Sequence, residues 1–418
     1  MSEMTATRMV AKLATIIGAA ALWLLAAAFL WRTKVPSGLE LPDLDPRQFF
    51  SAAELSRTLS YERFQRIDWL LSVVATIAAL VVVARRGLRL AREIALGRIG
   101  TGIVLGMLTL TTVWFVNLPF AVASRWWEHR HGLTRGGWLE WLLEPWAQLV
   151  GQVGLALLTI VVVLVLTGRF PRRWWIAAAP AFTLIALLFG FTFPYLDALG
   201  THGLRSPALK AAARTLERRE GVEGTPISVQ DVSKTSTQAN AMSEGIGPSR
   251  RVILWNTLLD GRFSFAEVKL VIAHELGHTA RRHIWKGVAW FGLFALPGAF
   301  VIAEVTRRRG GLRNPGLLPL GMLVLVLLQL VAMPLVNVIS RRYEAEADWI
   351  ALETTRDPAA ARGLFEQFSR TSLQQPRPPR WDYVLLEGHP TIIQRIAMAE
   401  AWRARNLRRS AAVLPAGS

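Results

Sequence analysis

The chain has 418 residues, of which 52% are hydrophobic, and its mean hydropathy is +0.31. So apolar a composition argues against a soluble protein of this size. The formal net charge is +18 and cysteine is absent, which excludes disulfides, cysteine-based zinc sites and thiol catalysis.

The apolar residues gather in segments long enough to span a bilayer, and charged residues bound each segment. We predict seven membrane helices, at 13–31, 69–84, 101–124, 146–168, 174–196, 287–303 and 317–339. Two of these segments, 69–84 and 287–303, are short for a span, so we expect their helices to continue past the charged ends. The first segment lacks a small-residue cleavage site, which favours a membrane helix over a signal peptide.

Arginines supply most of the positive charge and are spread over the loops and both termini. This distribution favours contact with anionic lipid headgroups, and no aromatic-basic module for nucleic acid is present. We therefore expect a lipid bilayer as a partner and no nucleic acid. Arginine and lysine are more numerous in the loops on the N-terminal side, which places the N-terminus in the cytoplasm and residues 197–283 and 340–418 outside.

The polar segment 197–283 begins with an amphipathic pattern at 206–220, which predicts a helix. Short β-rich runs at 226–232, 238–243 and 251–255 predict three strands, with turn residues between the last two. The edge strand of such a sheet can pair with an extended peptide.

Residues 274–278 read His-Glu-Leu-Gly-His, an H-E-x-x-H pattern inside an apolar run. Ser264 and Glu267 form a capping-box pattern that predicts the start of a helix. On that helix His274 and His278 share a face, so both rings can bind one metal ion. The alternative, two surface histidines on a soluble helix, is disfavoured by the apolar flanks, because buried histidines need partners.

The chemistry predicted for this helix is that of a zinc hydrolase. Zinc lowers the pKa of a bound water towards neutrality, and Glu275 lies where its carboxylate can take the proton of that water. A catalytic zinc normally has three protein ligands. His283 lies on another face of the helix, and Arg281 and Ile284 do not fit the extended metzincin pattern.

The third ligand is expected in residues 340–348, Ser-Arg-Arg-Tyr-Glu-Ala-Glu-Ala-Asp. Glu344 and Asp348 are four residues apart and share a helix face. Glu344 is the candidate ligand, and Asp348 can accept the N–H of a ligand histidine. Glu346 points away from that face and is interpreted as a solvated carboxylate. The alternative for Glu344 is a surface charge paired with the nearby arginines.

These motifs resemble the integral-membrane zinc metallopeptidases of the CAAX prenyl protease 1 (Ste24-type) family, which is related to the HtpX-type proteases. The resemblance covers the motifs at 118–120, 128–134, 236–241, 251–259, 274–278, 340–348 and 389–395. Asn256 replaces the usual Asp of the family, and Leu133 and Thr134 depart from its Phe-Asn. The match runs from about residue 60 to residue 400.

The resemblance implies a role for each matching residue. His274, His278 and Glu344 would bind one Zn²⁺ per chain, and Glu275 would be the general base and later the proton donor. Asp348 would support a ligand histidine. The remaining three residues would contact the substrate or orient the site. His389 and Asn240 would donate to the oxyanion or hold the substrate backbone, and Arg395 would orient carboxylates or substrate carbonyls. Simpler readings are a histidine at a helix start for His389 and a turn residue for Asn240.

The expected fold is mainly α: a polytopic membrane protein with seven transmembrane helices and a small α+β, gluzincin-like zinc-peptidase domain. The resemblance adds an intramembrane chamber between the helices, and it implies a catalytic domain on the cytosolic side, opposite to the arginine count. We divide the chain into membrane region 1–196, catalytic segment 197–283, membrane helices 284–339 and C-terminal catalytic segment 340–418.

The predicted function is a membrane-embedded zinc metalloendopeptidase. The resemblance implies prenylated CAAX-type substrates, whereas an alanine- and arginine-rich chain without cysteine is typical of bacteria and favours misfolded membrane or secreted proteins. The expected partners are thus peptide or protein substrates, with or without a lipid, and the expected location is a bacterial cell membrane. The alternative is a non-enzymatic transporter or scaffold that retains the fold; the presence of His274, Glu275, His278 and Glu344 argues against it.

Overall fold

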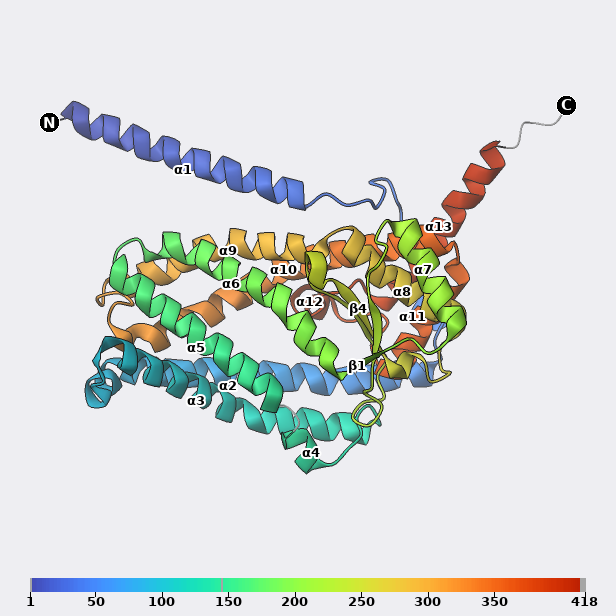
Figure 1. The fold of residues 1–418 in the computed structure, drawn as a ribbon, viewed down its shortest axis with the longest axis horizontal. Coiled ribbons are helices and arrows are strands. Elements are labelled where there is room, and N and C mark those ends of the chain that lie inside the picture. Colours follow the sequence, from blue (N-terminus) through green and yellow to red (C-terminus); the bar gives the residue numbers. More distant parts are fainter. Residues whose placement is uncertain (1, 144–145, 414–418) are drawn as a thin grey trace.

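The computed structural model describes residues 2–143 and 146–413. Residues 1, 144–145 and 414–418, which belong to the predicted N-terminal membrane region and C-terminal segment, lie outside the described residues. Long helices run along the long axis of the molecule, and a small sheet with shorter helices lies at one end of them (Figure 1). The described chain is therefore mainly helical, as predicted.

Six helices in the described part of the chain are long and apolar enough to cross a membrane. They are α2 (Ala52–Ile94), α3 (Gly97–Arg130), α5 (Trp146–Arg169), α6 (Trp174–Asp197), α9 (His283–Arg307) and α10 (Leu318–Thr355). The lengths of α2 and α9 confirm that the two short apolar segments continue as helix past their charged ends. The seventh predicted span falls in α1 (Ser2–Leu30), whose described apolar part, Ile17–Leu30, is shorter than a span. Within the described residues there are thus six candidate spans, and the predicted span at 13–31 lies partly outside the residues whose side chains are described.

Small residues let two of the long helices approach closely. An added Cβ at Gly102 of α3 would lie 2.6 Å from the side chain of Leu164 in α5, and one at Gly106 would lie 2.7 Å from Ile160. Leu164 and Ile160 are buried in this contact. Close backbone approach through glycine is a usual way to pack helices in a bilayer, where water does not drive association.

The sheet has four strands in the order β1-β2-β4-β3. The strands are β1 (Thr201–Gly203), β2 (Ile227–Gln230), β3 (Ala241–Glu244) and β4 (Arg251–Trp255). Strands β2 and β4 pair in parallel, and the outer strands pair antiparallel to them. The three predicted strands are confirmed as β2, β3 and β4, whereas β1 was not predicted because three residues carry no readable alternation. Strand β3 forms one edge of the sheet and lies against the helix of the H-E-x-x-H motif, with Ser243 Oγ 2.9 Å from Thr279 Oγ1.

The end of the molecule that holds the sheet has its own hydrophobic core. Around it pack α7 (Pro207–Glu220), α8 (Phe265–Ala280), α11 (Pro358–Ser372) and α13 (Ile392–Val413), and α12 (Arg380–Leu385) lies between the last two in sequence. Leu254, Ile272, Leu276 and Ile396 in this core are almost completely buried. Helix α10 leaves its apolar segment and continues unbroken into the core, so one helix joins the spans to the site.

Glu220, the last residue of α7, has no hydrogen-bond partner for either carboxylate oxygen within residues 2–143 and 146–413. Burial raises the pKa of this carboxyl to about 8, although Thr354 and His274 nearby oppose the rise. A glutamate in an unfolded chain has a pKa of about 4.3. The folded state therefore holds more protons between these two values, and its stability is lost as the pH rises through that window.

We expect Glu220→Gln to stabilise the protein at pH 8, because the amide fills the same space without a charge to bury. The gain should be on the order of 4 kcal/mol at pH 8 and should shrink towards zero below about pH 4, where the carboxyl is neutral in both the folded and the unfolded chain. Thermal unfolding in detergent at both pH values measures the difference. The exposed Glu223→Gln is the matched control, and an equal effect of Glu220→Gln at both pH values would contradict the assignment.

Candidate active site

Helix α8 presents the H-E-x-x-H motif to the interior of the protein. The predicted capping box forms at its start: Ser264 N–H donates to Glu267 Oε2 at 2.7 Å, and Glu267 N–H donates to Ser264 Oγ at 3.3 Å. Ile272 and Leu276 anchor one face of α8 in the core. His274 and His278 lie on the face turned towards α10, with their Nε2 atoms 3.1 Å apart.

Glu344 on α10 completes a cluster of three possible metal ligands. Its Oε2 lies 3.3 Å from His274 Nε2, and its Oε1 lies 3.4 Å from His278 Nε2. The three side chains could hold one ion, since their ligand atoms all lie within 4.8 Å of one another. Helix α10 thereby brings together residues that are about seventy positions apart in sequence.

The spacing of these atoms fits a zinc ion. Ligands placed tetrahedrally around zinc at its usual bond lengths lie about 3.3 Å from each other, and the observed separations are 3.1, 3.3 and 3.4 Å. Glu344 Oε2 is buried and has no hydrogen-bond partner among the described residues, an arrangement that costs free energy unless a cation is bound. Two imidazoles and one carboxylate are the donor set of many catalytic zinc sites.

Asp348 and Arg395 support the first histidine. His274 Nδ1 lies 2.9 Å from Asp348 Oδ1, on the side of the ring away from the cluster. Arg395 binds both oxygens of Asp348, through Nε at 2.8 Å and Nη2 at 2.6 Å. The aspartate is buried, so this bidentate ion pair compensates its charge and fixes its orientation. Arg395 thus orients a carboxylate, one of the two roles that the resemblance implies.

Glu275 lines a cavity of about 320 Å³ next to the three possible ligands. Its side chain is buried, and burial raises the pKa of its carboxyl to about 7, with the charge of His274 acting in the opposite direction. A carboxylate with a pKa near the working pH can both accept and return a proton. Every residue that the sequence analysis proposed for the site lines this cavity.

His389 and Asn240 both line the cavity. His389 Nε2 lies 3.4 Å from Glu344 Oε2, and its side chain is 56% exposed. Asn240 lies just before β3, and its Oδ1 accepts from the N–H of Ala241 at 2.9 Å, which leaves the amide N–H₂ free for another partner. Residues 241–243 of β3 line the cavity beside it, so the open edge of the sheet borders the site.

The prediction for Glu346 was wrong. The sequence analysis took it for a solvated carboxylate, but its side chain is completely buried and surrounded by Arg281, His283 and Lys286. The reason lies in tertiary packing, because α9 and the segment after α1 cover the face of α10 that was expected to be exposed. A signal was present: four basic residues lie within the six positions that follow α8, and burying basic side chains requires a counter-charge.

His283 was set aside as a ligand because of its place on the helix. Its ring is not part of the cluster of His274, His278 and Glu344. It contacts the Nδ1 side of the His278 ring instead, with the two Nδ1 atoms 2.9 Å apart. This contact depends on a break between α8 and α9 that the sequence analysis did not foresee. Arg282 there adopts a left-handed conformation with φ of +55°.

Part of the chain, including the candidate site, is similar to a described protein family. Residues 204–403 match the family model described as "Peptidase family M48". An "Uncharacterized metalloprotease YhfN" of Bacillus subtilis is 24% identical over 401 residues, which cover 88% of this chain and 90% of that protein. A "CAAX prenyl protease 1" of Saccharomyces cerevisiae is 37% identical over 82 residues, 19% of this chain and 18% of that protein.

Among solved structures, the crystal structure of S. mikatae Ste24p has the same fold. The TM-score is 0.76 at 18% sequence identity, and the match covers 91% of this chain and 96% of that one. The expected likeness to Ste24-type proteins is thus confirmed for the fold of nearly the whole chain.

Proposed function

Because residues 204–403 match the model of peptidase family M48, we propose that the chain is a membrane-embedded zinc metalloendopeptidase with one Zn²⁺ per chain. The observation that carries this proposal is the cluster of His274, His278 and Glu344 beside Glu275 in one cavity. The presence of Glu275 together with all three possible ligands argues against the alternative of a non-enzymatic transporter or scaffold. When bound, zinc would act as a Lewis acid that lowers the pKa of a water molecule and polarises the scissile carbonyl.

The other steps of the proposed hydrolysis depend on side chains that line the cavity. Glu275 accepts the proton of the attacking water and then passes it to the leaving amine, which its place on the cavity wall and its raised pKa support. His389 and the amide of Asn240 are free to donate to the carbonyl oxygen or to the substrate backbone. Asp348, held by Arg395, keeps the ring of His274 in one tautomer and orientation.

The substrate binds as an extended strand along β3. This strand is at the edge of the sheet, lines the cavity and can pair with a peptide through its backbone. A peptide on this edge would bring its carbonyl groups past the cluster. The proposed substrates are unfolded segments of misfolded membrane or secreted proteins, which offer such strands without a fixed sequence. The similarity of a short region to a CAAX prenyl protease 1 favours lipidated C-termini as a second candidate.

The proposed location is a bacterial cell membrane, in line with the Bacillus subtilis relative that matches most of the chain. The proposal also includes α1 as a seventh span. Trp23 of α1 donates from Nε1 to the Leu293 carbonyl of α9 at 3.0 Å, and Leu30 packs against Trp290. The division into membrane parts 1–196 and 284–339 and catalytic parts 197–283 and 340–418 belongs to the same proposal, as does the intramembrane chamber.

The experiment that tests the function uses the detergent-purified full chain and a peptide pool. The pool contains matched peptides with prenylated and plain C-termini, and mass spectrometry identifies the products. We expect internal cleavage of plain peptides, loss of cleavage with a chelator and recovery with added zinc. Cleavage confined to prenylated peptides would select the second substrate class, and a zinc-loaded protein that cleaves no peptide would contradict the proposed function.

A further inference from the structure

His283 lies beneath the second histidine of the metal cluster. Helix α8 ends at Ala280, and the left-handed turn at Arg282 reverses the chain so that α9 begins at His283. The His283 ring is buried, and its Nδ1 lies 2.9 Å from His278 Nδ1. The Nε2 atom of His278 faces the cluster, so His283 contacts the nitrogen that cannot bind the same ion.

Glu346 holds the other end of the His283 ring. Its Oε2 lies 3.0 Å from His283 Nε2, and its Oε1 accepts from Arg281 Nε and from the backbone N–H of Lys34, both at 2.7 Å. Lys286 Nζ is 3.5 Å away. The carboxylate is fully enclosed, but its charge and both its oxygens are compensated.

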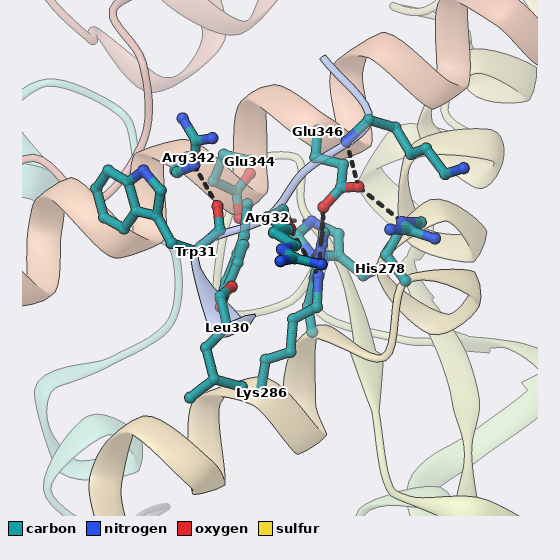
Figure 2. Close-up of polar contacts among 12 residues, drawn as sticks. Leu30, Trp31, Arg32, His278, Lys286, Arg342, Glu344 and Glu346 are labelled. Atoms are coloured by element: carbon teal, nitrogen blue, oxygen red, sulfur yellow. Dashed lines mark hydrogen bonds and ion pairs between the residues drawn. The ribbon is translucent and has the colours of Figure 1, made fainter. Parts of the chain in front are cut away.

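The end of α1 and the segment that follows it cover Glu346 and the basic residues around it. Figure 2 shows the chain at Leu30 to Arg32 beside the turn of α10 that carries Glu344 and Glu346. Tyr343 Oη donates to the Leu30 carbonyl at 2.8 Å, and Arg342 Nε donates to the Trp31 carbonyl at 2.6 Å. These contacts shield Glu346 from water, which strengthens its interaction with His283.

Only one arrangement of protons satisfies these contacts when His278 binds a metal through Nε2. A neutral imidazole that gives Nε2 to a metal carries its proton on Nδ1, and that N–H needs an acceptor. The acceptor is His283 Nδ1, so His283 must carry its own proton on Nε2 and donate it to Glu346. The same logic applies to His274, whose Nδ1 faces Asp348 directly.

We propose that His283 and Glu346 are positioning residues for the metal site, which hold His278 in the tautomer and orientation that bind zinc. The inference rests on the proposed zinc site. His274 contacts its supporting carboxylate, Asp348, directly, whereas His278 reaches Glu346 through the ring of His283. Partners of this kind usually contribute tenfold to a hundredfold to metal affinity. A merely structural role for His283 would instead depend on its ring, which stacks on Tyr343 at 4.6 Å between centroids.

Two substitutions of His283 separate these roles. His283→Asn loses the stack but keeps an acceptor oxygen near the position of Nδ1, whereas His283→Phe keeps the stack and has no acceptor. Zinc affinity is measured by competition with a chelator of known affinity, together with kcat/KM on a cleaved peptide. We expect His283→Asn to lose about tenfold in zinc affinity, because it keeps the acceptor but loses the contact with Glu346, and His283→Phe to lose about a hundredfold.

Glu346→Gln tests the carboxylate and should lose about tenfold in zinc affinity, because a neutral amide polarises His283 less. The control is His202→Asn, at a half-buried histidine of β1 that does not line the cavity, and it should bind zinc as the unmodified protein does. Equal affinity of His283→Phe and the unmodified protein, or weaker binding by His283→Asn than by His283→Phe, would overturn the inference alone. An unmodified protein that binds no zinc would overturn the proposed function as well.

Discussion

Glu275→Gln is expected to lower kcat/KM for peptide cleavage by about a thousandfold, within the range that general acid–base catalysis contributes. The amide has nearly the same shape as the carboxylate but cannot accept the proton of a water. Glu275 is not one of the three clustered ligands, so zinc should remain bound at one ion per chain. Peptide cleavage measured by fluorescence, with zinc content measured on the same sample, checks both parts of the expectation.

The matched control for this substitution is Glu267→Gln on the same helix. Glu267 belongs to the capping box, does not line the cavity, and glutamine is also accepted at that position of the box. Glu267→Gln should therefore keep both zinc and activity. If Glu275→Gln cleaved peptides at the rate of the control, a different group would have to remove the proton, and the assignment of Glu275 would fail.

Local spacing explains why much of this site could be predicted. His274 and His278 are four residues apart on a helix, and so are Glu344 and Asp348, so each pair shares a face whatever the rest of the fold does. The capping box at Ser264 is equally local and forms as predicted. That the two helices face each other could not be derived from either spacing, and it came from the resemblance to a family.

The contacts that the sequence could not reveal cross between distant segments or depend on an unexpected backbone turn. Glu346 was misjudged because its burial depends on α9 and on the backbone at Lys34, which lies more than three hundred positions away. The contact between His283 and His278 depends on a left-handed arginine, a conformation that sequence predicts only for glycine or asparagine. The ion pair between Arg395 and Asp348 joins α13 to α10.

For the membrane helices, the sequence predicted most of what the structure shows. Apolar segment length identified six helices that the structure confirms as candidate spans, because a bilayer requires a nearly continuous apolar run. Length could not show where a helix continues into water. Helix α10 runs on from its apolar part to Glu344, so the proposed third ligand lies on the same helix as a candidate span.

Glu344→Ala should remove zinc from the protein and abolish cleavage. Its two oxygens lie 3.3 and 3.4 Å from the imidazole nitrogens, so the substitution leaves a site with two protein ligands where a catalytic zinc needs three. We expect zinc affinity to fall by roughly a hundredfold or more. Zinc binding to the folded state also raises its stability, so the zinc-dependent rise in unfolding temperature of the unmodified protein should disappear.

Thermal unfolding with and without added zinc measures this effect without any substrate, and Glu304→Ala, an exposed glutamate of α9 outside the cavity, is the control. Glu344→Asp separates charge from reach, since its carboxylate is one methylene shorter: it should bind zinc more weakly than the unmodified protein but more tightly than Glu344→Ala. A Glu344→Ala variant that kept both zinc and its thermal shift would place the third ligand elsewhere. His389 would then be the next candidate, because its Nε2 is 3.4 Å from the oxygen that was removed.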